Sequence, residues 1–340
     1  MQGAQRVRLS PLYTPEFVMS PTVELLHAMD LVTLADEWGE GFADWVYATR
    51  AALADDRYAE LAACNAAVSW GRLLARLYPD GRLTASFDDL LRALRGLERK
   101  AFTQLAPEPA THEGTPEATR LVATLRRNPV KLKETYVRTV ETFLQEHLQA
   151  RWDEDKTLLR EEVEARRGLA WPAPLHAWIE TLTGRGIAPE PAFEAAKRLV
   201  AVPTRLLGPF VTLSLLETNP TTLLLLYGGG GVSERSGEDR TGSARVAAGF
   251  KGLGDETRLR ILQLVADREM YAHEIGAHFS HLGQPAVSRH LRYLAGLGLL
   301  TTRNAQARTY YSLNRSCVRD LAARLQELAS PGRKPSRRRA

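Results

Sequence analysis

The chain has 340 residues, of which 44% are hydrophobic and 25% charged, a composition typical of an ordinary soluble protein that can form real apolar cores. Its length exceeds that of one small domain, so we expect two domains. Its two cysteines, Cys64 and Cys317, provide neither a disulfide framework nor a zinc-ligand set, which agrees with a reducing cytoplasm.

The net charge of +5 is unevenly distributed along the chain. Residues 331–340 contain five basic side chains and no acidic one, and residues 244–330 contain 12 Lys or Arg and 7 Asp or Glu. Residues 1–243 hold 28 basic and 33 acidic side chains. The basic C-terminal part is typical of a polyanion-binding domain, whereas the acidic N-terminal part needs a different role.

Neither the start of the chain nor its most apolar segment indicates a membrane function. The start, MQGAQRVRLS, has no apolar run of the kind that signal peptides carry. The most apolar region, residues 206–227, is interrupted by Glu217, Asn219 and Pro220, which argues against a membrane span. We therefore expect a cytoplasmic protein with no membrane partner.

Residues 5–227 are predicted to form a mainly helical domain. Apolar side chains at helical spacing predict helices over residues 42–53, 59–78, 87–105 and 132–163. The last of these carries one apolar stripe, formed by Leu132, Tyr136, Val140, Phe143, Leu144 and Leu148. Asn128-Pro129 marks the break before that helix.

Other segments of the same domain have loop or strand character. Residues 106–116 are polar and rich in proline, which predicts a loop. Residues 213–216 and 222–227 are expected to be strands, with a turn at Thr218-Asn219-Pro220. The domain should end at residue 227.

Residues 228–243, GGGGVSERSGEDRTGS, are predicted to be a flexible linker, since they combine glycine, serine and both charge signs without an apolar face. Four consecutive glycines could also suggest a phosphate-binding loop. The segment has neither a Gly-Lys-Ser/Thr ending nor GxGxxG spacing, so we favour the linker.

Residues 244–328 are predicted to form a second domain of helices and a two-stranded wing. Asp255 is expected to cap a helix that runs through Val265. Further elements follow in chain order: a first helix over 245–253, a third over 271–279, a fourth from 284, strands over 301–303 and 309–312, and a last helix over 316–328. Residues 329–340 are expected to be a disordered basic tail.

The helix that begins at Gln284 has two contrasting faces. Val287, Leu291, Leu294 and Leu297 recur at helical spacing and are expected to face a core. The opposite face carries Ser288, Arg289 and Arg292, with Gln284 at the entrance and Tyr293 at the flank. Arg and Gln can form paired hydrogen bonds to base edges in the major groove, so this helix is suited to DNA recognition.

Three motifs of this domain resemble the ArsR family of bacterial winged-helix regulators: LGDETRLRILQLV (253–265), QPAVSRHLRYLAGLGLL (284–300) and RTYYSLN (308–314). The resemblance covers about a quarter of the chain and implies a homodimer that binds an operator of double-stranded DNA with two-fold symmetry. The expected DNA-binding residues are Gln284, Pro285, Ser288, Arg289, His290, Arg292 and Tyr293 in the helix, and Arg303 and Arg308 in the wing.

The sequence departs from the metal-sensing members of that family. Tyr271 and His273 stand where those regulators carry a Cys-x-Cys pair, and they cannot supply two thiolates. The last helix offers only Asp320 and Glu327 in place of the ligands of zinc-sensing relatives. His273 and His278 are five residues apart, so they do not share a helix face as an HExxH motif requires. We therefore expect no metal and no cofactor.

The N-terminal part resembles an uncharacterised helical domain that precedes some ArsR-type DNA-binding domains. VRLSPLYTPEFVMSPTVELLHAM is similar to its start, and VPTRLLGPFV with LLLLYG to its end. All six Trp, at positions 38, 45, 70, 152, 171 and 178, lie in this part. They could line a pocket for an aromatic or hydrophobic effector, or simply pack the core.

We predict a mainly α protein with small β parts: an N-terminal helical domain followed by a winged helix-turn-helix domain. The predicted function is a sequence-specific DNA-binding transcriptional regulator, a repressor that does not depend on metal. An unknown small-molecule effector or partner of the N-terminal domain would control it. Catalytic motifs such as GxSxG or a phosphate loop are missing from the sequence, so we expect no enzyme. The alternatives are an enzyme domain tethered to a DNA-binding domain and an architectural DNA-binding protein without effector.

Overall fold

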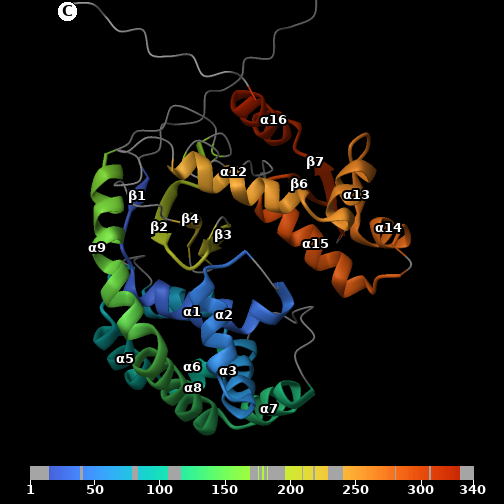
Figure 1. Cartoon of the computed structure of the whole chain (residues 1–340). Coiled ribbons are helices and arrows are strands. Elements are labelled where there is room, and N and C mark those ends of the chain that lie inside the picture. The colour runs from blue at the N-terminus through green and yellow to red at the C-terminus, as the bar shows by residue number, and fades with distance from the viewer. Residues whose placement is uncertain are drawn as a thin grey trace, which may run out of the picture. The chain divides into compact units, whose positions relative to one another are not determined.

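The computed structural model describes residues 15–38, 41–78, 83–105, 116–168, 175, 178–179, 182, 196–208, 210–216, 219–228, 240–279, 281–305 and 308–329. The chain divides into two compact units: an N-terminal unit of residues 1–178 and 189–238, and a C-terminal unit of residues 179–188 and 239–340. Among the described residues, helices dominate both units, and each unit holds one small sheet (Figure 1). This confirms the predicted fold class.

Parts of the predicted linker, loop and tail lie outside the described residues, namely 229–239, 106–115 and 330–340. Helix α12 begins at Arg240, earlier than the predicted helix over 245–253. Residues 240–243 of the predicted linker are therefore helical.

The N-terminal unit is built mainly from helices that follow one another closely in the chain. They are α1 (Pro21–Trp38), α2 (Asp44–Ala52), α3 (Asp55–Ala67), α4 (Trp70–Leu77), α5 (Phe87–Gly96), α6 (Arg99–Gln104), α7 (Pro116–Arg127), α8 (Pro129–Phe143), the π-helical turn η1 (Leu144–Leu148) and α9 (Gln149–Arg166).

Two predicted helices are each divided in two. Residues 59–78 belong to α3 and α4, because the backbone is extended at Val68 and Ser69 begins a new helix by accepting a hydrogen bond from the Arg72 amide at 3.3 Å. Residues 87–105 belong to α5 and α6, with extended backbone at Leu97 and Glu98. Apolar side chains keep a helical spacing across both breaks, so periodicity alone does not reveal them.

The predicted helix over 132–163 is confirmed and is longer. It begins at Pro129, where the Asn128 side chain accepts a hydrogen bond from the Lys131 amide at 3.1 Å, and it continues through η1 to the end of α9. Every member of its predicted apolar stripe is buried, with at most 5% of the side chain exposed.

Helix α1 is a central element that the sequence pattern does not reveal. Eight of its apolar side chains, on all sides of the helix, are at most 2% exposed: Val23, Leu25, Leu26, Ala28, Met29, Leu31, Val32 and Ala35. A helix that is apolar all round has no amphipathic period, and such helices are buried in a core.

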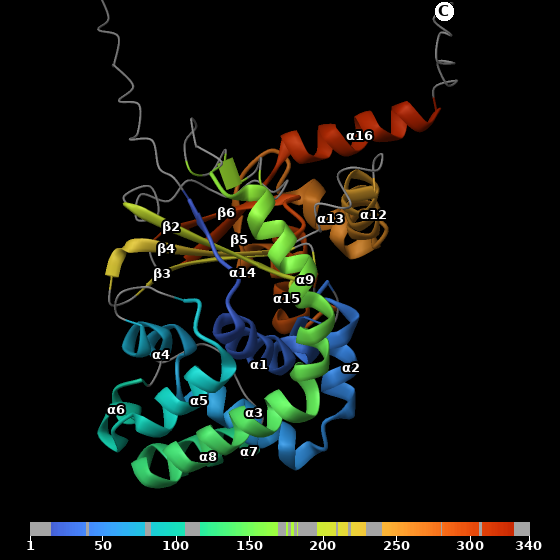
Figure 2. The same ribbon diagram turned by 90° about the vertical axis from the view of Figure 1, so that its left-hand side faces the viewer.

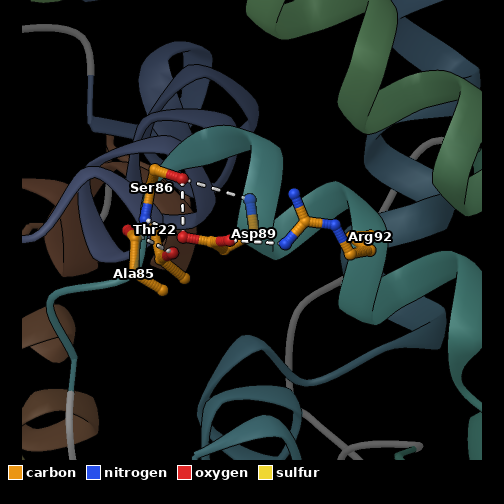
Figure 3. A network of polar contacts seen from close by, with 5 residues as sticks. All are labelled: Thr22, Ala85, Ser86, Asp89 and Arg92. Atoms are coloured by element: carbon orange, nitrogen blue, oxygen red, sulfur yellow. Dashed lines mark hydrogen bonds and ion pairs between the residues drawn. The ribbon is translucent and has the colours of Figure 1, made fainter.

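Helix α5 begins with a capping box that is tied to the start of α1 (Figure 3). The Ser86 hydroxyl accepts a hydrogen bond from the Asp89 amide at 3.2 Å, and the Asp89 carboxylate accepts one from the Ser86 amide at 3.3 Å. Arg92 forms an exposed ion pair with Asp89 at 2.7 Å. The Thr22 hydroxyl donates to the Ala85 carbonyl at 3.2 Å, so the two helix starts are held together.

The sheet of the N-terminal unit joins residues far apart in the sequence. Its strands are β1 (Glu16–Phe17), β2 (Arg198–Thr204), β3 (Val211–Leu216) and β4 (Asn219–Gly228), in the spatial order β1-β2-β4-β3. β2 is parallel to β1 and β4, and β3 is antiparallel to β4. This confirms the two predicted strands, while β1 and β2 are additional. Helix α9 packs on β2 (Figure 2).

The C-terminal unit has the predicted order of elements. They are α12 (Arg240–Leu253), α13 (Glu256–Leu264), β5 (Met270–Tyr271), α14 (Ala272–Ala277), α15 (Gln284–Gly296), β6 (Leu300–Ala305), β7 (Arg308–Leu313) and α16 (Arg315–Ala329). The strands form a sheet of order β5-β7-β6, in which each pair is antiparallel. The wing strands are longer than predicted, and β5 is an addition.

Two glycines allow close packing inside this unit. A Cβ atom at Gly249 of α12 would lie 2.7 Å from a methyl carbon of Leu321 in α16, so the glycine lets the two helices approach. A Cβ atom at Gly252 would overlap Leu297, at the end of α15. Helix α12 therefore packs closely against Leu297, just after α15, and against α16.

Candidate nucleic-acid interface

The group of three helices α13, α14 and α15 begins at the cap of α13. The Asp255 carboxylate accepts a hydrogen bond from the Arg258 amide at 2.9 Å, which confirms the predicted cap. Ile261 and Leu262 point into the core of the unit, with 0% and 4% of their surface exposed. Helix α13 packs against α15.

Helix α15 has the predicted inward face. Val287, Leu291 and Leu294 are fully buried, and Leu297 just after the helix is 6% exposed. Pro285 lies in the first turn, where a missing amide hydrogen does no harm. The apolar stripe thus fixes which face of the helix remains for a partner.

Four of the predicted DNA-binding residues lie toward solvent. Gln284, Pro285 and Arg289 are exposed, and Ser288 is half-buried. Gln284 lies over α14, since a Cβ atom at Gly276 would overlap the side-chain oxygen of Gln284. Gln284, Ser288 and Arg289 fall within six residues of each other at the N-terminal end of α15.

Tyr293 does not share that exposure. Its side chain is only 4% exposed, and the guanidinium carbon of Arg258 lies 4.0 Å from the centre of its ring. A base contact needs an accessible side chain, so the predicted direct contact by Tyr293 does not agree with its burial.

His290 and Arg292 are half-buried and face other parts of the unit. The His290 Nδ1 atom accepts a hydrogen bond from Arg258 Nε at 3.4 Å and lies 3.9 Å from the Asp255 carboxylate. Burial lowers the pKa of His290 below its ordinary value. Burial also lowers the pKa of Arg292, whose charge lies near Tyr311 of β7.

The wing is a regular antiparallel pair. Thr301 lies opposite Ser312, and their hydroxyl oxygens are 2.7 Å apart. Arg303 and Arg308 lie in β6 and β7, on either side of residues 306–307, which lie outside the described residues. The backbone of both arginines is described, whereas their side chains are not.

Tyr271 and His273, where the resemblance places the Cys-x-Cys pair of metal-sensing regulators, belong to an aromatic cluster. The Tyr271 ring stacks on His273 at 6.4 Å and meets Tyr310 edge-on at 5.9 Å. Within the described ranges of the chain, no three His, Cys, Asp or Glu side chains form a group that could hold a metal ion. In the same ranges, we find no helix with the length and apolar character needed to cross a membrane.

Residues 255–302, which span α13 to the first wing strand, match the family model of the bacterial regulatory protein, arsR family. Over 71 residues the chain is 34% identical to the transcriptional repressor SdpR of Bacillus subtilis, and the match covers 21% of this chain and 78% of that repressor. The chain belongs to the arsR family of bacterial regulatory proteins. Its C-terminal unit is therefore a winged helix-turn-helix module of a DNA-binding transcriptional regulator.

Two further arsR-type relatives differ in the direction of their effect. The chain is 31% identical over 86 residues to the transcriptional activator HlyU of Vibrio cholerae, with 25% of this chain and 79% of HlyU covered. It is 35% identical over 76 residues to the arsenical resistance operon repressor of Staphylococcus aureus, with 22% and 72% covered. Family membership alone thus fixes neither repression nor activation, and it describes only a quarter of the chain.

In the N-terminal unit, the described Trp rings pack at separate places. Each contacts a different ring: Trp45 lies 6.4 Å from Phe143, Trp70 5.9 Å from His27, Trp152 5.5 Å from Phe87 and Trp178 6.0 Å from Phe17. Trp171 and the side chain of Trp38 lie outside the described residues. These four contacts agree with core packing and do not bring the rings together around one pocket.

The same unit buries a group of charged side chains that the sequence reading does not identify. Asp155 of α9 forms ion pairs with Arg151 at 2.5 Å and Arg205 at 3.0 Å. Nearby, Glu24 of α1 is 4% exposed and accepts a hydrogen bond from the Thr204 hydroxyl at 3.0 Å. Burial raises the pKa of Glu24 to about 8, so this carboxyl group holds its proton at neutral pH.

Proposed function

We propose that this protein is a sequence-specific DNA-binding repressor in which the exposed end of α15 reads the major groove. The observation that carries the proposal is the exposure of Arg289 and Gln284 on a helix whose opposite face is fully buried. Arg can form two hydrogen bonds to guanine, and Gln two to adenine. Ser288 and Pro285 would contact the same groove, while Arg303 and Arg308 would reach neighbouring phosphates or the minor groove.

We propose a homodimer on an operator with two-fold symmetry. In α16, Leu321 packs against Gly249 of its own unit, whereas Leu325 is 50% exposed. The exposed part of the apolar stripe supports pairing between two copies through their last helices. Each copy would then present one α15 to one half-site.

We further propose that the regulator responds to a ligand or partner of the N-terminal unit and not to a metal. The acidic character of residues 1–243 makes that part unsuitable for binding DNA itself. The replacement of two thiolates by Tyr271 and His273 supports independence from soft metals. The protein would act in the cytoplasm and would have no catalytic activity.

The competing possibility is an N-terminal enzyme. Incubation of the full-length protein with candidate metabolites separates the two: saturable binding without turnover supports the sensor, while product formation supports the enzyme.

The DNA-reading role is tested by Arg289→Ala. If Arg289 contacts a guanine, the variant should lose about 1–3 kcal/mol of binding free energy for the operator and discriminate less well at one base position. Arg99→Ala is the matched control, because it removes one exposed arginine from the N-terminal unit. Binding is followed by fluorescence anisotropy. Equal operator affinity of Arg289→Ala and the parent would contradict the assignment.

A further inference from the structure

Helix α15 is held from two sides by consecutive residues. Tyr293 faces Arg258 of α13, and Arg292 lies near Tyr311 of β7. Neighbouring positions on a helix differ by about 100° around its axis, so the two residues reach different elements. The orientation of the recognition helix therefore depends on both an adjacent helix and the wing sheet.

The contact to α13 is the better defined of the two. Arg258 is 9% exposed, and its guanidinium group meets two side chains of α15. It lies 4.0 Å from the centre of the Tyr293 ring and donates a hydrogen bond to His290 Nδ1 at 3.4 Å. His290 and Tyr293 are three residues apart and share one helix face, so rotation of α15 about its axis would break both contacts.

The backbone of Arg258 is also held in place, by the Asp255 side chain. Its backbone amide donates to the Asp255 carboxylate at 2.9 Å, and that carboxylate lies 3.9 Å from His290 Nδ1. The cap of α13 and the side of α15 therefore belong to one polar network. The His290 and Asp255 side chains are 22% and 40% exposed, so this network is partly buried, and its members restrict one another's geometry.

The reading residue Arg289 lies next to this network. It directly precedes His290 and, unlike Arg258, is exposed. A small rotation of α15 would move the Arg289 guanidinium out of the plane of a base edge, and paired hydrogen bonds tolerate little displacement.

We propose that Arg258 is a positioning residue for base recognition. It contacts His290 and Tyr293, holds α15 in the orientation that places Arg289 against a base, and contacts no base itself. This proposal rests on the DNA-reading role proposed above. It reassigns His290 and Tyr293 from direct contact with DNA to support of the helix. Sequence discrimination should therefore depend on Arg258, although general attraction to DNA should not.

The test uses the full-length protein and the duplex that the parent selects from random DNA, together with a scrambled duplex of equal length and composition. Arg258→Met keeps the length of the side chain and removes its charge, and Tyr293→Leu removes the ring. Arg268→Met is the matched control, because it removes the same charge at an exposed position of the same unit. Discrimination is the Kd for the scrambled duplex divided by the Kd for the selected duplex. For Arg258→Met and Tyr293→Leu we expect this ratio to fall about tenfold, as for one mismatched base pair. The Kd of both variants for scrambled DNA and the ratio for Arg268→Met should stay near the parent values.

Circular dichroism establishes that each variant is folded at the assay temperature. A folded Arg258→Met variant with the parent's Kd ratio would overturn the proposal. So would an equal rise of both Kd values in a folded variant, because it indicates a loss of general affinity for DNA and not of sequence discrimination. If Arg258→Met does not fold, the Kd ratio of Tyr293→Leu tests the proposal.

A second measurement separates this proposal from the DNA-reading role. Amide hydrogen exchange in α15, without DNA, should be faster in Arg258→Met and Tyr293→Leu and unchanged in Arg268→Met. Unchanged exchange in all three would overturn the positioning role, whatever DNA does. If the parent selects no sequence while amide exchange in α15 changes as expected, the DNA-reading role is wrong. The stabilisation of α15 by Arg258 is then still supported.

Discussion

The Thr204 hydroxyl donates a hydrogen bond of 3.0 Å to the carboxyl group of Glu24, which is almost fully buried between α1 and the end of β2. Thr204 in turn accepts a hydrogen bond from the Leu206 amide at 3.1 Å. A carboxyl group in such a place disfavours ionisation, because burial removes the water that would stabilise its charge. This pair makes the stability of the N-terminal unit depend on pH.

Glu24→Gln should remove that dependence. Burial raises the pKa of Glu24 from 4.5 to about 8, so between these values the folded protein binds a proton that the unfolded chain has released. This contribution to stability is therefore present below pH 4.5 and is lost as pH rises to 8, at up to about 1.4 kcal/mol per pH unit. Urea unfolding of parent and variant from pH 6.5 to 8 measures it. Glu161→Gln, an exposed change on α9, is the control. Parallel slopes for Glu24→Gln and the parent would refute the prediction.

His27 should have the opposite effect at lower pH. It is 4% exposed, stacks on Trp70, and burial lowers its pKa from 6.5 to about 4. The unfolded chain therefore binds the extra proton, and stability is lost as pH falls from 6.5 towards 4. His27→Phe should reduce this acid sensitivity, whereas the exposed change His278→Gln should not. We would measure urea unfolding between pH 4.5 and 6.5, and an unchanged acid slope in His27→Phe would rule out the assignment.

Gly252→Ala should destabilise the C-terminal unit although alanine favours helices. The new methyl group would overlap Leu297 and lie 3.1 Å from a methyl carbon of Leu299. Overpacking of this kind costs about 1–3 kcal/mol. Gly96→Ala, at the end of α5, is the matched control: its methyl group meets nothing within 4 Å, so we expect a gain of up to about 1 kcal/mol. Thermal unfolding of both variants gives the comparison. A stable Gly252→Ala variant would contradict the close packing of α12.

Leu325→Glu should convert the proposed dimer into a monomer. Leu325 is half exposed on α16, so the substitution should leave the fold of one copy intact and introduce charge into the interface. Sedimentation velocity of parent and variant gives the two masses, and Gln326→Glu, exposed on the same helix, is the control. A dimeric Leu325→Glu variant would place the interface elsewhere.

Much of the C-terminal unit is predictable because its signals are local. Asp255 caps α13, Pro285 opens α15, and the apolar spacing from Val287 onward defines the buried face. The positions of His290, Arg292 and Tyr293 are not predictable in this way. Their side chains can lie either in water or against a neighbour, and only the presence of Arg258 and Tyr311 decides which.

The N-terminal unit shows where sequence patterns fail. Glu16 pairs with Val200 across most of the unit, and no local pattern encodes such a pairing. The burial of Glu24 and Asp155 is equally hidden, because it depends on Thr204 and Arg205, which follow far along the chain.

Selection of bound sequences from a pool of random duplex DNA, with the full-length protein, tests the central claim most directly. We expect an enriched inverted repeat with half-sites about one helical turn, 10–10.5 base pairs, apart. Arg289→Ala should give a weaker consensus within each half-site. An unenriched pool, or a consensus that Arg289→Ala leaves unchanged, would contradict the account of α15 as the element that reads DNA.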